Sequence, residues 1–200
     1  MQYVEDIHEL ETLYGEPGSA SLRKVAYKLT PKYLEWIMAS RFCIVSTAGD
    51  EGTDGSPRGD DGPVVQAMDE HTLLLPDWRG NNRMDTLRNI VSDGRISLMF
   101  MAPGSNTVIR VNGAAKVTLD TEICARFEFK NKLPRSVIVI KVAEIYTQCA
   151  RALMRANLWN APAVTGLPSP GDLLAEQAQG EDGGATYDDA WGARAAKTMW

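Results

Sequence analysis

Histidine and cysteine are scarce in this sequence of 200 residues, which holds only His8, His71, Cys43, Cys124 and Cys149 of these two types. With two histidines, a histidine-based metal site and a Ser-His-Asp triad are nearly excluded. The cysteines show no CxxC and no Cys/His spacing. An odd number of scattered cysteines favours a reducing compartment over a disulfide framework.

Long apolar runs and an excess of basic charge are also missing. No stretch of about 18 apolar residues occurs, so no membrane-spanning helix is expected. Residues 1–13 are acidic and amphipathic and lack the basic start and apolar run of a signal peptide, so a cytoplasmic protein is expected. The net charge of −5, from 21 basic and 26 acidic residues, argues against a nucleic-acid partner. A local basic cluster can still bind a small anion.

The hydrophobic pattern changes along the chain from helical to strand-like. Two N-terminal segments have helical spacing, residues 4–14 and 20–29, and Thr30-Pro31 can begin a third helix. Six later segments have the pattern of strands, at residues 42–47, 64–68, 72–75, 96–101, 107–118 and 136–142. Short helices are predicted at residues 84–91, 120–129 and 150–159.

The order of these segments predicts the fold class. Residues 48–63 are rich in Gly and Asp and predict a loop, and Gly113 predicts a bulge or a close backbone approach. Because β-α-β alternation is mostly missing, we expect a mainly β fold with peripheral helices (α+β) around an antiparallel six-stranded core. Closing such a sheet into a barrel would remove its edges.

The amino-acid composition changes at Ala161, where prolines and glycines break the regular hydrophobic pattern. Short helices are predicted at residues 172–178 and 188–199. Because this segment is apolar and carries Tyr187, Trp191 and Trp200, we expect it to pack on something. The predicted organisation is therefore a domain over residues 1–160 and a C-terminal extension over residues 161–200, packed on the barrel or on a dimer partner.

The densest polar cluster is Pro76-Asp77-Trp78-Arg79-Gly80-Asn81-Asn82-Arg83, between the end of a strand and the start of a helix. A helix N-terminus offers unpaired N–H groups and a positive dipole end, which together bind phosphate. Arg79 and Arg83 add charge-assisted hydrogen bonds, and Asn82 can cap the helix or donate to phosphate. The alternative, a capped helix with its arginines in solvent, is equally consistent with the spacing alone.

Three further groups carry charge that chemistry can use. Arg58 lies in a polar segment that either reaches an anion or forms a surface turn. Arg110 lies between apolar residues of a predicted strand, so it is either paired or on a solvated face of the sheet. Arg151, Arg155 and Trp159 share one helical face, which is also the pattern of an amphipathic helix whose arginines extend into solvent.

Taken in order, these motifs resemble the FMN-binding subfamily related to pyridoxamine 5′-phosphate oxidase, over about residues 25–160. The matching segments are Ser56-Pro57-Arg58-Gly59-Asp60, Leu75-Pro76-Asp77-Trp78-Arg79-Gly80-Asn81-Asn82-Arg83, Asp85-Thr86-Leu87-Arg88-Asn89-Ile90, Arg95-Ile96-Ser97-Leu98-Met99-Phe100 and Arg110-Val111-Asn112-Gly113. The resemblance implies a homodimer of split β-barrels with two FMN molecules at the subunit interface.

The resemblance also implies which residues hold the flavin. Asn82 and Arg83, with Arg79 nearby, would hold the FMN phosphate. The backbone of Leu75, Pro76 and Asp77 would line the isoalloxazine edge. Arg58 and Arg110 would approach from neighbouring strands, and Trp159 would cover the ring from across the dimer.

Two departures argue against the reaction of the true oxidase. Gln66 stands where the oxidase has a lysine, and no histidine follows His71, so the oxidase's Arg-x-His motif is absent. The leading hypothesis is an FMN-dependent oxidoreductase that passes hydride from a reduced nicotinamide nucleotide to a small acceptor. The alternatives are a non-enzymatic flavin-binding or storage protein, and a split barrel that uses deazaflavin or haem. The scarcity of histidine argues against haem with a His ligand.

Overall fold

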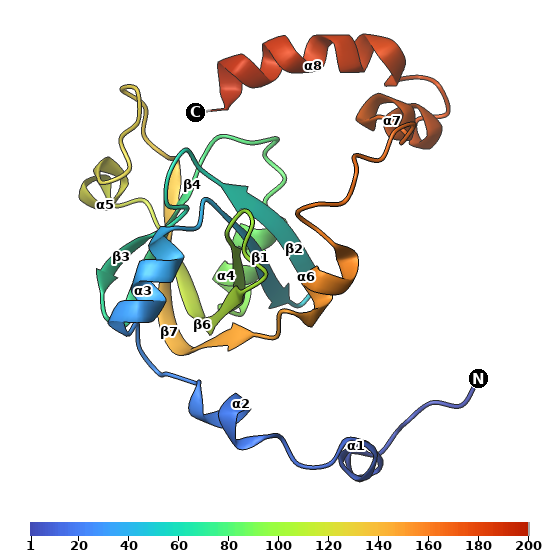
Figure 1. Ribbon diagram of the computed structural model, residues 1–200. Coiled ribbons are helices and arrows are strands. Elements are labelled where there is room, and N and C mark those ends of the chain that lie inside the picture. The colour runs from blue at the N-terminus through green and yellow to red at the C-terminus, as the bar shows by residue number, and fades with distance from the viewer. Residues whose placement is uncertain (200) are drawn as a thin grey trace.

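Seven antiparallel strands form one sheet in the computed structural model, which describes residues 1–199 (Figure 1). The order across the sheet is β2-β1-β5-β6-β7-β4-β3. The strands are β1 Phe42–Gly49, β2 Gly52–Gly59, β3 Gln66–Asp69, β4 Thr72–Asp77, β5 Arg95–Met101, β6 Val108–Thr118 and β7 Ser136–Gln148. The predicted mainly β fold with peripheral helices is confirmed.

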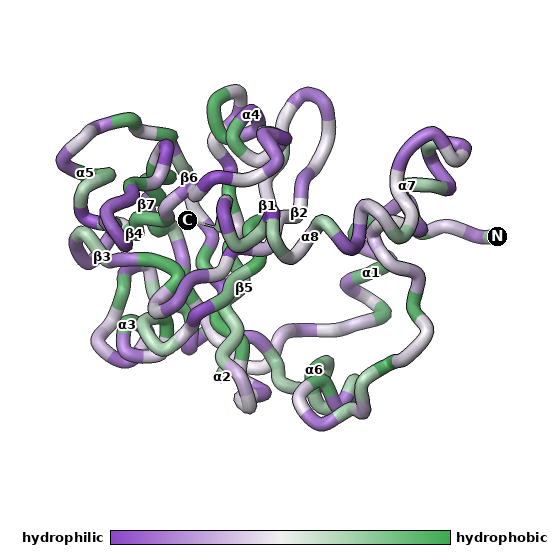
Figure 2. Tube along the Cα trace, turned by 90° about the horizontal axis from the view of Figure 1, so that it is seen from above, coloured by the Kyte–Doolittle hydropathy of each residue, from purple (hydrophilic) through white to green (hydrophobic). Residues whose placement is uncertain are grey.

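Alternation of side chains, clearest in β5, builds the main core on one face of this sheet. In β5, Ile96, Leu98 and Phe100 are buried, whereas the residues between them are half-exposed. Val45 of β1 and Ile140 of β7 are fully buried in the same cluster. Figure 2 shows hydrophobic stretches along the barrel strands as well as in segments outside the barrel. Because side chains in a strand point to opposite faces in turn, this pattern fixes which residues face inward.

The sheet curls so that its ends approach each other without joining. In the described chain, no ladder of hydrogen bonds links β2 to β3, so these two strands remain edges. Arg58 of β2 nevertheless forms an ion pair with Asp77 of β4, although β2 is first and β4 sixth in the order. The register of β6 on β7 shifts between Asn112 and Gly113, as the sequence predicted, and such a bulge increases local bending.

The helices lie around the barrel: α1 Ile7–Tyr14, α2 Ser19–Arg23, α3 Pro31–Met38, α4 Asp85–Ser92, α5 Thr121–Ala125, α6 Arg151–Ala156, α7 Pro170–Gln177 and α8 Gly184–Thr198. α3 starts with Pro31 after Thr30, as expected, and buries Ile37 in the core. α4 packs on β1, where the Asn89 side-chain amide donates to Thr47 Oγ1 at 3.1 Å. α4 is thereby held with its N-terminus beside β2.

The prediction of a loop over residues 48–63 is wrong, and it accounts for the difference between the expected six strands and the observed seven. Residues 52–59 form β2, which pairs with β1 along its whole length. The alternation was hidden because the half-buried side of β2 carries Asp54, Ser56 and Arg58 instead of apolar residues. An edge strand also tolerates the proline and glycines that argued for a loop.

Other elements differ from expectation in length. The predicted helix at 20–29 ends at Arg23, because Ala26 forms an isolated β-bridge with Ile145. α5 ends at Ala125 and α6 at Ala156, so both are shorter than predicted. β7 continues to Gln148, six residues beyond the predicted end at Val142.

The C-terminal segment forms two helices, close to where they were predicted. α7 and α8 pack on each other, since the Asp188 carboxylate accepts from Ser169 Oγ and from the Gly171 backbone N–H. Trp200, which was expected to pack, lies outside the described residues. Within the described part of the chain, no helix is both long and apolar enough to span a membrane.

Candidate functional site

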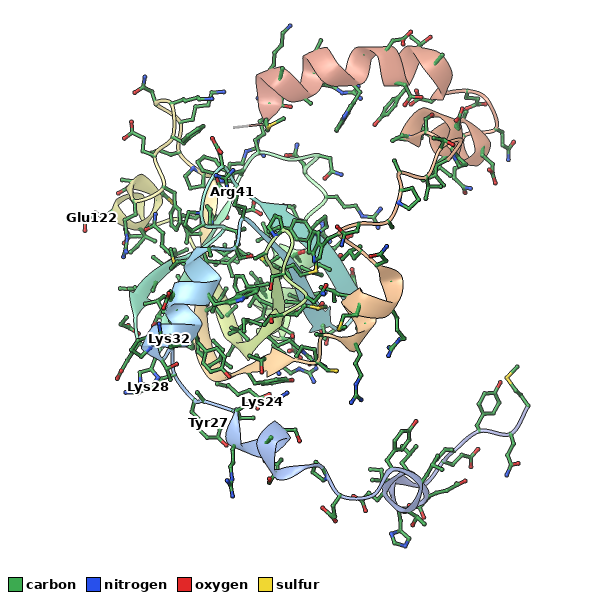
Figure 3. All side chains as sticks on the ribbon, viewed as in Figure 1. Lys24, Tyr27, Lys28, Lys32, Arg41 and Glu122 are labelled. Atoms are coloured by element: carbon green, nitrogen blue, oxygen red, sulfur yellow. The ribbon has the colours of Figure 1, made fainter. Side chains whose placement is uncertain are left out.

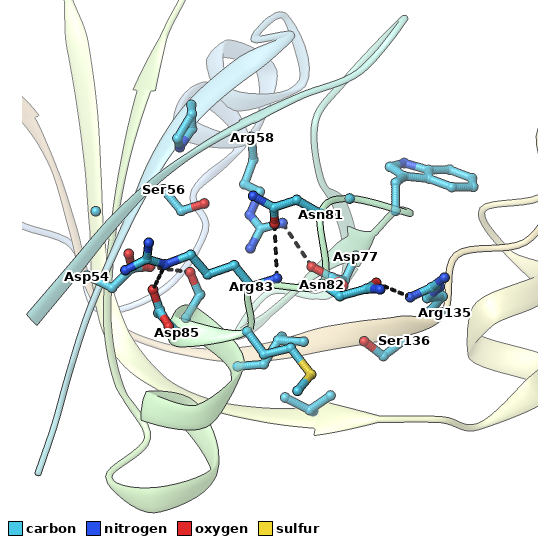
Figure 4. A pocket seen from close by; sticks show the side chains of 18 of the residues that line it. Asp54, Ser56, Arg58, Asp77, Asn81, Asn82, Arg83, Asp85, Arg135 and Ser136 are labelled. Atoms are coloured by element: carbon cyan, nitrogen blue, oxygen red, sulfur yellow. Dashed lines mark hydrogen bonds and ion pairs between the residues drawn. The ribbon is translucent and has the colours of Figure 1, made fainter. Parts of the chain in front are cut away.

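A cleft of about 520 Å³ opens between β2, β4 and the N-terminus of α4 (Figure 4). Polar and charged side chains from three separate parts of the chain converge on it. Those labelled in Figure 4 are Asp54, Ser56, Arg58, Asp77, Asn81, Asn82, Arg83, Asp85, Arg135 and Ser136. Such a concave site with a few convergent polar groups is typical of small-molecule binding.

Arg58 is the most enclosed cation of the cleft. Its Nη1 donates to Asp77 Oδ1 at 2.8 Å, and its side chain is 21% exposed. Its Nε is buried and has no hydrogen-bond partner in the described chain. Arg58 of β2 pairs in register with Cys43 of β1. Burial raises the pKa of the Cys43 thiol to about 12, and the positive charge of Arg58 opposes part of this rise. A buried N–H without a partner is costly, and Arg58 carries this unsatisfied donor in the wall of the cleft.

The segment between β4 and α4 forms one wall of the cleft. Asn81 Oδ1 accepts from the Arg83 backbone N–H at 3.0 Å, which folds the segment into a tight turn. Asn82 has a φ of 63°, in the left-handed region that asparagine tolerates better than most residues. Its Oδ1 accepts from Arg135 Nη1 at 2.7 Å. The segment is therefore tied to the residues that precede β7.

Arg83 projects into the cleft but is already paired. Its Nε donates to Asp85 Oδ2 at 2.6 Å, and the carboxylate raises the pKa of the Arg83 guanidinium. Asp54 adds to that rise and also accepts from the Thr86 hydroxyl. Arg83 is largely exposed, so an anionic ligand can compete with Asp85 for it at little cost.

A second cleft of about 180 Å³ adjoins the first through Arg58, Trp78 and Gly80. Leu75, Pro76 and Arg79 line it. The Trp78 indole N–H donates to Asp60 Oδ2 at 3.0 Å, which fixes the ring at the rim. The pairing of β3 with β4 covers Leu74 but not residues 75–77, so this stretch of backbone is free of β3 on that side.

The predicted site residues thus fall into two groups. Seven line one or both clefts: Arg58, Leu75, Pro76, Asp77, Arg79, Asn82 and Arg83. Arg110 and Trp159 do not line them. The Arg110 guanidinium lies 5.6 Å from the centre of the Tyr146 ring, and the Trp159 indole N–H donates to the Ser105 carbonyl at 2.8 Å. In a single copy of the chain these two residues are apart from the others.

Sequence reasoning missed several residues that line the larger cleft. Asp54 and Ser56 were assigned to a loop, so their shared side of a strand was not visible. Arg135 lies in no motif, and the cleft receives it because β7 begins beside β4, where Asp77 pairs with Ser136. The only signal for Arg135 was a charge placed directly before a strongly apolar strand.

A sequence model of the pyridoxamine 5′-phosphate oxidase family matches residues 29–149. No curated protein matches the chain in sequence. Among solved structures, a single-residue variant of HupZ from Group A Streptococcus has a TM-score of 0.50 at 17% identity, over 60% of this chain and 99% of that chain. This likeness shows the fold.

Two other solved structures have lower scores. An FMN-binding protein from Syntrophomonas wolfei subsp. wolfei has a TM-score of 0.46 at 14% identity, over 72% of this chain and 97% of that chain. The FAD binding protein from Mycobacterium smegmatis has a TM-score of 0.43 at 12% identity, over 62% and 97%.

Proposed function

We propose, from the premise that the chain belongs to the pyridoxamine 5′-phosphate oxidase family, that it binds FMN in the cleft between β2, β4 and α4. One observation carries the proposal: three guanidinium groups, those of Arg58, Arg83 and Arg135, line one cleft at the N-terminus of a helix. Arginine side chains and helix N-termini are the groups that proteins use to bind phosphate.

The residues present fit the phosphate end of FMN. Arg83 and Asn82 would contact the phosphate, with Arg79 at the rim, and Arg58 Nε supplies a buried donor that lacks a partner. The combined cavity volume of the two clefts lies within the range of small-molecule sites.

The ring end would lie along β4. Residues 75–77 are free of β3 on one side, which supports the assignment of their backbone to the isoalloxazine edge. Arg110 and Trp159 do not line the clefts, so their assignment requires a second copy of the chain. The proposal therefore includes a homodimer of the domain over residues 1–160, with the segment over residues 161–200 as an extension.

The proposed activity is that of an oxidoreductase in which a reduced nicotinamide nucleotide and a small acceptor are the two substrates. Bound FMN supplies hydride acceptance and donation, and the protein supplies orientation and electrostatics. The reaction is not that of the true oxidase, because the chain lacks the lysine and the later histidine of that enzyme. Gln66, at the lysine position, donates instead to the Arg126 carbonyl at 2.9 Å.

An absorbance spectrum of the purified protein tests flavin binding. We expect flavin bands as isolated or after addition of FMN, and bleaching on anaerobic addition of a reduced nicotinamide nucleotide. Bands without bleaching would support a storage protein rather than an oxidoreductase. Protein that stays colourless when FMN is titrated would refute the proposal.

Replacement of Arg83 tests the phosphate assignment. We expect Arg83→Ala to weaken FMN binding by about tenfold or more, because a charge-assisted hydrogen bond to phosphate is lost. Riboflavin, which has no phosphate, should bind both proteins alike. Arg88→Ala, on an exposed part of α4 outside the cleft, is the matched control. Equal losses for the two ligands would show that Arg83 does not touch the phosphate.

A further inference from the structure

The N-terminal arm, residues 1–18, presents an apolar helix face that is not buried against the described part of the chain. Asp6 caps α1, its carboxylate accepting from the His8 backbone N–H at 2.9 Å. The helix places Ile7, Leu10 and Tyr14 on one side, yet Ile7 is 73% and Tyr14 79% exposed. No residue of α1 is buried. Figure 3 shows the side chains of the arm standing clear of the barrel.

An eight-residue helix of this kind needs a partner. Isolated helices shorter than about 12 residues are marginal in water, and most helical stability comes from packing of the apolar face. The arm also has one sign of charge. It holds no Lys or Arg and five carboxylates, those of Glu5, Asp6, Glu9, Glu11 and Glu16. Its partner must therefore be both apolar and basic.

The barrel has a surface with this chemistry on the outside of its sheet. Ile44, Met99, Arg110 and Tyr146 lie side by side across β1, β5, β6 and β7. They point away from the core, since each stands next to at least one buried residue of its strand, and all four are half-exposed. We call these four residues the outer sheet face. It is apolar apart from one central guanidinium.

Basic groups surround the outer sheet face, and the one carboxylate beside it in β7, Glu144, accepts from the Asn112 side-chain amide at 2.7 Å instead of pairing with them. Arg110 and Lys24 both stack on Tyr146, at 5.6 and 5.8 Å from the ring centre. α6 follows the end of β7 and adds Arg151 and Arg155, which are exposed. Across residues 1–199, none of these four cations forms an ion pair with a carboxylate. This surface therefore has cations without carboxylate partners, and the arm has carboxylates without cations.

We propose that the arm of one copy docks on the outer sheet face and α6 of a second copy, and that two copies exchange arms. In its own chain, the segment after the arm is pinned to β7 by the Ala26–Ile145 bridge, and the arm stands off from the barrel (Figure 1). The inference rests on the proposed homodimer but not on flavin, and it gives Arg110 a contact with the partner's arm in place of the contact with the partner's flavin that the resemblance implies.

Charge reversal in trans tests the exchange. One variant reverses the arm, Glu9→Arg with Glu11→Arg, and a second reverses the surface, Arg151→Glu with Arg155→Glu. Analytical ultracentrifugation would measure the dimer dissociation constant of each. We expect each variant alone to show at least about a tenfold increase, since like charges then meet. An equimolar mixture should recover the dimer, because each arm then meets a surface of opposite charge.

The mixture separates exchange from docking within one chain. Failure of the mixture to recover the dimer would overturn the proposal, as would a dissociation constant that neither variant changes, or a wild-type chain that stays monomeric. Glu176→Arg with Glu181→Arg, at exposed positions of the C-terminal segment, is the matched control and should leave the constant unchanged. Circular dichroism would check folding, and FMN titration of the same samples reports the proposed function separately.

Discussion

Arg58 shows how one residue joins the fold to the site. It lies on an edge strand, pairs with Asp77 of a distant strand, and leaves its Nε without a partner. Its charge also reaches Cys43 through the β1–β2 pairing, although burial is the larger influence on that thiol. Arg58 is thus largely buried in the fold, and it also carries a donor without a partner in the wall of the candidate site.

The three cysteines differ in environment, and their reactivity should differ accordingly. Burial raises the pKa of the Cys43 thiol to about 12, and burial also raises the pKa of Cys124. Cys149 is exposed. Because the thiolate is the reactive form, a thiol reagent at about pH 8 should label Cys149 alone in the native protein and all three after denaturation. Mass spectrometry of labelled peptides checks this, and rapid native labelling of Cys43 would contradict the burial described.

β2 shows, at the scale of an element, where sequence reasoning fails and why. Strands with an apolar inner side, such as β5, were predicted because their apolar residues form a recognisable run in the sequence. The inner side of β2 is polar because it lines the larger cleft, through Asp54, Ser56 and Arg58. A strand that serves a binding site breaks the pattern by which strands are recognised. The cluster of residues 76–83 was found because it carries its charges in one short run.

Gly113 is a strand position at which the sequence indicated a bulge or a close backbone approach. A Cβ at this position would lie 2.0 Å from the Lys141 carbonyl oxygen, so β6 and β7 could not keep their spacing. We expect Gly113→Ala to lower the free energy of unfolding by about 1–3 kcal/mol, as overpacking does. Gly55→Ala in β2, where a Cβ would meet nothing within 4 Å, should change it by less than about 0.5 kcal/mol. Urea denaturation measures both, and equal effects would show that the bulge relaxes freely.

At the scale of the whole molecule, the seven-stranded sheet curls into a barrel, and in the described chain its two edge strands are not joined by hydrogen bonds. Sequence order predicted the antiparallel sheet, because this depends on neighbours along the chain. It could not predict that Arg58 meets Asp77 or that Arg135 meets Asn82, because these contacts depend on how far the sheet curls. The site lies at the seam where β2 approaches β4, so curvature and cleft have one structural cause.

The Arg58–Asp77 pair should therefore stabilise the whole barrel as well as the site. The two side chains are 21% and 15% exposed, so removal of the carboxylate leaves a largely buried cation without its partner. We expect Asp77→Ala to lower the free energy of unfolding of the flavin-free protein by about 2–3 kcal/mol. Glu35→Ala, which breaks the exposed pair with Lys32, is the control and should have little effect.

A double variant decides whether the charge or the contact holds the seam. Arg58→Met with Asp77→Leu removes both charges and keeps apolar bulk between β2 and β4, so most of the lost stability should return. The same protein should fail to bind FMN, because the buried donor is gone. If Asp77→Ala is as mild as Glu35→Ala, the seam is held by backbone and core alone. If instead the double variant is as unstable as Asp77→Ala, the ion pair itself is what joins the two ends of the sheet.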